Sequence, residues 1–382
     1  MSLKKLKTVV QIDLNGNVLE KTNRLSTTFA AAGKAGSYSM ALLNKTTAAF
    51  GQGLDKLSNR YTAFITGAAG GMAVRGAAAL ETRLEQLGIV ADKSGAYMQK
   101  LNERMLQVSQ KRHINIDPSQ LLSAVEQISA KTGELSVAEE NLENIAMVIS
   151  ATGASGEDVG SLFSNIFEKF NVKDAKEMLG VIDALANQGK MGAFELRDLA
   201  TQGERIISAY AAMGRTGKQA AVEMGTMMQL GRKGVGSTEQ AATAFEAVVR
   251  NLTDPKVMAN LKSVGINVKD AGGNFRAIPD IIKEIVIKAD GETEELGKVF
   301  DTFAQRMINP IAIAFNQAKK EGKTTAEAFA AMTDLMEVSS TGESVMADSA
   351  RMAKTFEASV VSLKSANRLC QPQPCRTYKQ AC

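Results

Sequence analysis

Few side chains in this sequence have the types and spacing that catalysis or metal binding requires. The chain has 382 residues, one histidine (His113) and three cysteines, Cys370, Cys375 and Cys382. A zinc site draws on histidine, cysteine and carboxylate ligands held close together, and a serine–histidine–aspartate triad needs a histidine beside its nucleophile. His113 follows a lysine and an arginine, which is typical of an exposed polar residue. We therefore predict no catalytic residue, no metal site and no enzyme activity.

One glycine-rich motif, Gly214-Arg-Thr-Gly217-Lys218, invites comparison with a phosphate-binding loop. That loop has a glycine five residues before its Gly-Lys pair and a serine or threonine directly after the pair. Position 212 is alanine and position 219 is glutamine, so the motif predicts a helix end and a turn. The run from Gly231 to Thr238 resembles an anion-binding nest, but a helix cap explains its hydroxyl groups better. We predict no cofactor-binding site.

Acidic residues are numerous, but their spacing builds neither a calcium site nor an acid–base pair. The run that starts at Asp13 matches the first three ligands of a calcium loop, whereas the required glycine at the sixth position is Val18. The run from Asp92 to Glu103 fails in the same way, because Tyr97 takes the glycine position. Adjacent carboxylates such as Glu294-Glu295 fall near predicted helix starts, where the helix dipole favours them.

The elements that must carry these residues are helices. The sequence has no tryptophan, 5% aromatic residues and 18 methionines. Aromatic and β-branched residues fill β-sandwiches and barrels, whereas Ala, Leu, Met, Glu and Lys favour helices. Apolar stripes at helical spacing, such as Leu142, Ile145 and Ile149, recur along the chain. We predict an all-α multi-helix array with short connections that turn at glycine.

Capping patterns mark where individual helices begin. Asp117-Pro118 and Asp254-Pro255 place a capping side chain before a proline suited to the first helical turn. Ser136-x-x-Glu139 and Thr324-x-x-Glu327 match the capping box. No repeat of fixed period and no unbroken heptad run is visible, so the sequence favours neither a solenoid nor a long coiled coil.

Four regions follow from these patterns. Residues 1–60 form a basic segment with one possible short strand (Thr8–Leu14) and a helix, and residues 61–115 form elongated Ala/Gly-rich and amphipathic helices. Residues 116–368 form a more compact helical core, and residues 369–382 form an atypical disordered tail with free, reactive thiols. Within the core, the stretch from Val159 to Leu335 is expected to bury these side chains: Phe163, Ile166, Phe245, Val248, Ile282, Phe300 and Phe303.

Charge is distributed unevenly along the chain. Residues 1–60 contain nine basic and three acidic residues, a net of +6, and residues 117–163 contain eight acidic residues and one lysine, a net of −7. Such asymmetry can steer partners. No aromatic residues alternate with the basic ones, so we predict no specific binding of nucleic acid.

Two neighbouring blocks, residues 236–252 and 261–275, are distinctive in composition and order. The first reads GSTEQAATAFEAVVRNL and the second LKSVGINVKDAGGNF. With them, the chain from about Ile145 to Leu363 resembles the core region of tail tape measure proteins of long-tailed bacteriophages and phage-like particles. It departs from the family between Val299 and Met307, where Phe-Gly and Arg-Gly pairs are usual. The likeness stops near Arg368, which suggests a frame change, a truncated prophage copy or a natural disordered tail.

The resemblance implies a structural assembly protein rather than an enzyme. Tape measure proteins act as scaffold and length ruler around which the tail tube polymerises, and they leave the tail before the DNA on infection. Their partners are the tail tube protein, tail assembly chaperones and proteins of the tail tip or baseplate hub. Self-association, with a trimer as one form, and membrane contact on infection are also implied. The expected location is the lumen of the virion tail, and the host cytoplasm during assembly.

Alternatives from other classes stay open at the level of sequence. The run from Ala63 to Ala79 contains Gly67 and Gly71 at a spacing that lets helices approach closely in lipid, which would suit a membrane-active or pore-forming protein. Close helix packing in water, or a glycine-rich joint, accounts for the same run. A generic helical adaptor is the other alternative.

If the chain acts as a ruler, one unbroken helix of its length would span at most roughly 570 Å.

Overall fold

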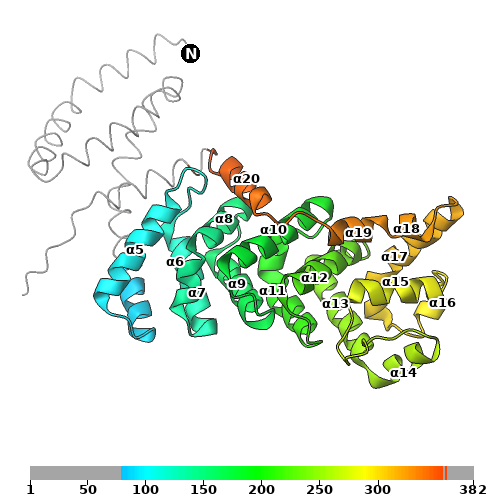
Figure 1. Ribbon diagram of the computed structural model, residues 1–382. Helices are drawn as coiled ribbons and strands as arrows, with labels where there is room; N and C mark the ends of the chain where they lie inside the picture. Colours follow the sequence, from blue (N-terminus) through cyan, green and yellow to red (C-terminus); the bar gives the residue numbers. More distant parts are fainter. Residues whose placement is uncertain (1–78, 356–357, 359–382) are drawn as a thin grey trace, which may run out of the picture. The chain divides into compact units, whose positions relative to one another are not determined.

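Figure 1 shows the computed structural model, which describes residues 79–355 and residue 358. The chain divides into two units, and all described residues belong to the unit Arg75–Leu369. Several sequence predictions lie outside the described residues. They are the possible strand at Thr8–Leu14, the Asp13 run, almost all of the glycine-rich run and the cysteine-containing tail at 369–382.

The all-α prediction is confirmed for the described residues, which form helices and a single isolated bridge between Lys269 and Phe275. A helix at 79–90 comes first. The helices that follow are α5 (Gly95–Ser109), α6 (Pro118–Thr132), α7 (Leu135–Glu140), α8 (Leu142–Thr152), α9 (Gly156–Lys169), α10 (Ala175–Met191), α11 (Leu196–Ala211), α12 (Gly217–Arg232), α13 (Thr238–Thr253), α14 (Pro255–Ser263), α15 (Ile278–Lys288), α16 (Thr293–Leu296), α17 (Thr302–Lys320), α18 (Thr325–Ala328), α19 (Ala330–Met336) and α20 (Glu343–Met352).

Neighbouring helices stack in two layers joined by short turns. In one layer α6 packs on α9, α9 on α11, α11 on α13 and α13 on α17. In the other layer α10 packs on α12, which also contacts α15 and α19. Because α12 is enclosed by neighbours on several sides, every residue from Ala220 to Gly231 is buried.

The last helix, α20, returns to the first half of the unit. It packs on α8 and on α10, although its sequence position follows α19 (Figure 1). α8 and α10 barely touch each other, so α20 supplies the neighbour that each lacks in this layer.

Most predicted helix starts agree with the structure. Asp117 and Asp254 cap α6 and α14 with their carboxylates, which accept hydrogen bonds from the first backbone N–H groups. Thr324 forms the predicted capping box with Glu327. The prediction that Ser136 caps a helix was wrong, because α7 already begins at Leu135. Burial of Leu135 and of the following apolar residues decides where this short helix starts.

The predicted interior is confirmed at six of its seven residues. Six of the predicted residues are each at most 1% exposed: Phe163, Ile166, Phe245, Val248, Ile282 and Phe300. The prediction for Phe303 was wrong, since this residue is 49% exposed. Asp301 caps α17, and the buried face of that helix runs through Ala304, Met307 and Ile311. Phe303 lies outside this face, with the Arg306 guanidinium 5.2 Å from its ring centre.

Two glycines let α6 and α9 approach at backbone distance. A Cβ atom at Gly156 would lie 1.8 Å from the carbonyl oxygen of Gln120, and one at Gly160 would lie 2.6 Å from that of Ala124. The Gly156 N–H also donates a hydrogen bond of 2.8 Å to the side chain of Gln120. The four-residue spacing puts both glycines on one face of α9, so the contact depends on the absence of side chains there.

Replacing Gly156 by alanine should lower the free energy of unfolding by about 1–3 kcal/mol, because α6 and α9 must move apart to admit the methyl group. Gly95→Ala is a matched control. Both glycines are the first helical residue after a serine cap, but a Cβ atom at Gly95 would meet nothing within 4 Å. This control should be neutral, or more stable by up to about 1 kcal/mol. Urea denaturation measures both; equal effects would contradict the close approach.

Candidate functional site

The motif Gly214–Lys218 forms the turn between α11 and α12, as its sequence predicts. Gly214 and Gly217 have φ angles of 75° and 76°, in the left-handed region that favours glycine. The Gly217 N–H donates a hydrogen bond of 2.6 Å to the carbonyl oxygen of Phe170, and the Lys218 ammonium donates to the hydroxyl of Ser340. These two donors of the motif are therefore bound within the protein.

Arg215 of the same turn forms an ion pair with a carboxylate in the interior. Its guanidinium contacts both oxygens of Glu223, with 3.0 Å between Nε and Oε2. The side chain of Glu223 is 1% exposed and that of Arg215 is 27% exposed. The hydroxyl of Tyr210 donates a third hydrogen bond to Glu223, and Nη1 of Arg215 lies 3.4 Å from the carbonyl oxygen of Phe275. This cluster joins α11, α12 and the segment before α15.

Burial raises the pKa of Tyr210 well above its usual value near 10, and the negative charge of Glu223 adds to this effect. The folded state therefore holds the phenol proton more tightly than the unfolded state does. Below pH 10 both states are protonated and the difference has no effect. Above pH 10 the unfolded state loses the proton first, so stability falls as pH rises toward the folded-state pKa.

Tyr210→Phe should remove this alkaline loss of stability, which amounts to about 1.4 kcal/mol per pH unit for one proton. Urea denaturation at several pH values from neutral to above pH 10 measures it. Tyr97→Phe is the control, because Tyr97 bonds to Glu139 near the surface and does not contact the cluster. The Tyr97→Phe protein should keep the Tyr210 part of the slope; equal slopes in wild type and Tyr210→Phe would contradict the assignment.

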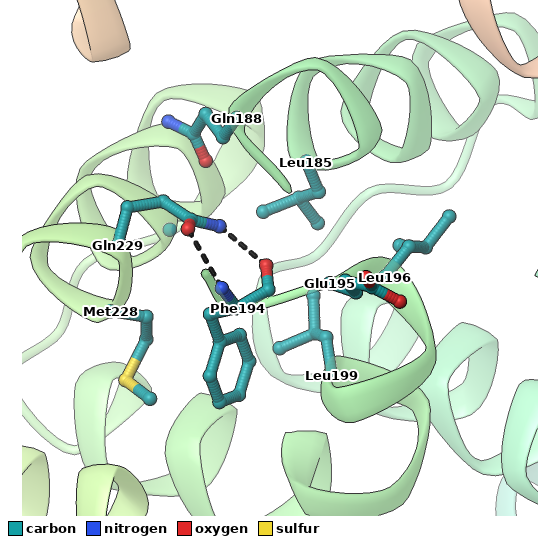
Figure 2. A pocket seen from close by; sticks show the side chains of 9 residues that line it. Leu185, Gln188, Phe194, Glu195, Leu196, Leu199, Met228 and Gln229 are labelled. Carbon is teal, nitrogen blue, oxygen red and sulfur yellow. Dashed lines mark hydrogen bonds between the residues drawn. The ribbon is translucent and has the colours of Figure 1, made fainter. Parts of the chain in front are cut away.

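Two buried glutamines, Gln188 and Gln229, hydrogen-bond to backbone groups of neighbouring segments, and Figure 2 shows the bonds of Gln229 to Phe194. The side-chain amide of Gln229 accepts a hydrogen bond of 3.0 Å from the Phe194 N–H and donates one of 2.5 Å to the Phe194 carbonyl oxygen. Gln188 donates to the carbonyl oxygens of Val222 and of Leu335, the latter at the end of α19. Both side chains line a cavity of about 10 Å³, which is the space of one water molecule. The cavity is far too small for a metabolite.

The remaining candidates from the sequence are dispersed. His113 is partly exposed, with Nε2 3.4 Å from a carboxylate oxygen of Glu143. Tyr97 lies inside α5, and Glu294-Glu295 occupies the first turn of α16. Among residues 79–355, no three or more His, Cys, Asp or Glu side chains gather into a group that could hold a metal ion. In the same part of the chain, no helix combines the length and the apolar character needed to cross a membrane.

Comparison with known proteins identifies the family. The model of the family described as phage-related minor tail protein matches residues 102–300, just over half of the chain. This chain belongs to the phage-related minor tail protein family. The match runs from α5 through the buried cluster and ends just before α17, so it covers most of the two-layer array.

A relative of this minor tail protein is the probable tape measure protein of Burkholderia phage BcepMu (isolate -/United States/Summer/2002). The two are 26% identical over 231 residues, which cover 59% of this chain and 27% of the relative. No solved structure matches the chain. The two matches confirm the resemblance to tail tape measure proteins and give this minor tail protein a structural role in a phage tail. Structural tail families of this kind are generally not enzymes.

Proposed function

We propose that this minor tail protein acts as scaffold and length ruler of a phage tail. The tail tube polymerises around it, and it leaves the tube before the DNA on infection. The observation that carries the proposal is the likeness to a probable tape measure protein over 231 residues. The likeness to the family lies in a helical array whose buried Gln188, Glu223 and Gln229 are hydrogen-bonded within the protein, as expected of a structural module rather than of a chemical site.

The proposed partners are the tail tube protein, the tail assembly chaperones and the proteins of the tail tip or baseplate hub. We also propose that copies of the chain associate with one another, as a trimer in one form. The protein would act in the host cytoplasm during assembly and occupy the lumen of the finished tail. Membrane contact would occur on infection.

We also propose that different regions of the chain serve different parts of this role. An extended helix contributes about 1.5 Å of length per residue, whereas helices that fold back on one another contribute much less. We propose that the core at residues 116–368 serves to start tube assembly. The length of the tail would then be set by regions that are more extended than this core. Residues 1–60 and 61–115 would form separate N-terminal regions, and residues 369–382 a tail without an assembly role.

Tube assembly in the presence of the chain tests the proposal. Tail tube protein and chaperones are mixed with or without the full chain, and tubes are counted and measured by electron microscopy. We expect more tubes, a narrower range of lengths and the chain inside purified tubes. Phe303→Ala, which alters an exposed residue, should act like wild type. Tubes of unchanged number and length that lack the chain would overturn the proposal.

The alternative of a membrane-active or pore-forming protein has no support from the matched proteins, both of which are tail proteins.

A further inference from the structure

The helix α20 is attached to the array by a small apolar face. Its buried side chains are Val345 and Ser349, and Ala353 follows just beyond its end. Met346 and Met352 point away from the array and are 48% and 43% exposed. Burial of so few apolar atoms contributes little free energy compared with the core helices.

Polar contacts supply much of the remaining attachment of α20. The buried carboxylate of Asp183 on α10 accepts a hydrogen bond of 3.0 Å from the Val345 N–H. The ammonium of Lys190, also on α10, bonds to the hydroxyl of Ser344 and lies 2.6 Å from a carboxylate oxygen of Asp348. These partners precede α20 by more than 150 positions, as the pair Lys190 and Ser344 shows with a separation of 154.

Contacts with the first half of the unit extend to the far end of α20. The hydroxyl of Ser349 donates to the carbonyl oxygen of His113, and the side chain of Asn115 donates to that of Ala353 at 3.3 Å. Ser150 of α8 lies 3.5 Å from the carbonyl oxygen of Ser349. α20 is therefore bound by α8, α10 and the turn before α6, all far from it in sequence.

The segment between α19 and α20, residues 337–342, is suited to act as a hinge. It forms no helix, and its positions before Gly342 are exposed or partly exposed. Two side chains of the second layer bind this segment. The amide of Asn187 donates a hydrogen bond of 2.9 Å to the carbonyl oxygen of Ser339, and the ammonium of Lys218 donates to the hydroxyl of Ser340. Gly342 has a φ of 92°, so the chain changes direction directly before α20.

Both α8 and α10 have other neighbours besides α20. α10 is held by α12, and α8 is held by α6 and α9. A helix with few buried apolar side chains, attached by a hinge to an otherwise complete array, opens at a lower free energy than the whole unit unfolds. Its departure uncovers the facing sides of α8 and α10.

We propose that the groove between α8 and α10 is an exchangeable docking site whose second occupant is α20 of another copy of this chain. The groove fits that helix because its partners, from the Asp183 carboxylate to Lys190, already bind the same residues within one copy. Exchange of an identical element keeps every contact and needs only the hinge to open in a new direction. The inference stands whether or not the protein is a tail ruler.

Cross-linking between copies tests the exchange. In full chains whose three native cysteines are changed to serine, one chain carries Lys190→Cys and a second carries Ser344→Cys. The two are mixed, incubated and treated with a short bis-maleimide. A covalent heterodimer is expected, because position 344 of one copy then lies beside position 190 of the other. Each chain alone is the baseline, and a chain with both changes, kept dilute, reports linkage within one copy.

A shortened hinge provides an independent measurement. Deleting Ser339 and Ser340 should prevent α20 from reaching its own groove and should raise the heterodimer yield several-fold. Adding Val345→Asp should abolish it, because the charge cannot enter the groove. Linkage within one copy without any heterodimer would overturn the proposal. If neither linkage forms, light scattering on the shortened chain decides, since a dimer supports exchange and a monomer overturns it.

Discussion

Replacing Phe245 by alanine is expected to lower the free energy of unfolding by roughly 3–5 kcal/mol. The side chain is fully buried on α13, and its ring centre lies 6.0 Å from that of Tyr210. Tyr210 in turn meets Phe170 edge to face at 6.3 Å. Removing the ring leaves a cavity among rigid aromatic neighbours that cannot collapse into it. Urea denaturation followed by circular dichroism gives the value.

Phe303→Ala is the matched control for this prediction. The same atoms are removed from a ring that is 49% exposed, so the change should stay within about 0.5 kcal/mol of wild type. Equal losses at both positions would show that the interior is misplaced.

Replacing Glu223 by alanine should have a comparable effect, a loss of roughly 3–5 kcal/mol. The change removes the acceptor of the Tyr210 hydroxyl and leaves the Arg215 guanidinium, mostly buried, without its counter-charge. Glu223→Gln keeps an acceptor for Tyr210 and should retain part of the stability. Thermal and urea denaturation at neutral pH compare the three proteins.

The pair Arg276–Glu284 provides the control for charge alone. It has the same spacing of eight residues and the same two-point contact, but the Glu284 side chain is 42% exposed. Glu284→Ala should therefore lower stability by only about 0.2–1 kcal/mol, as exposed pairs do. A loss at Glu223 no larger than that at Glu284 would mean that burial adds nothing to the cluster.

Local hydrogen bonding made most helix starts predictable from the sequence. The remaining features depend on tertiary packing, which the sequence pattern does not contain. Asp117, Asp254 and Thr324 cap helices because each bonds to backbone groups two or three residues away. Ser136 has the same local pattern, but burial of Leu135 starts the helix earlier. Phe303 is expected in the interior from the sequence, whereas its phase on α17 places it outside the buried face.

The polar cluster and the close approach of α6 and α9 depend on contacts between distant elements. A signal was present for both. Glu223 lies within a run of apolar and small residues on α12, from Ala220 to Met228, which indicates a carboxylate that needs an internal partner. Gly156 and Gly160 have the same four-residue spacing as Gly67 and Gly71, where close packing was considered. The partners Gln120 and Ala124 could not be chosen from spacing alone.

The return of α20 to α8 ties completion of the fold to the progress of translation. Ser150 and Ser349, which meet where these helices touch, are 199 positions apart. At about 5–20 residues per second, the ribosome needs on the order of 10–40 s to make the helix that covers α8. Throughout that interval the sides of α8 and α10 that α20 covers stay open to chaperones and to other nascent chains on the same messenger RNA. The fate of each molecule is then set by whichever helix reaches the groove first.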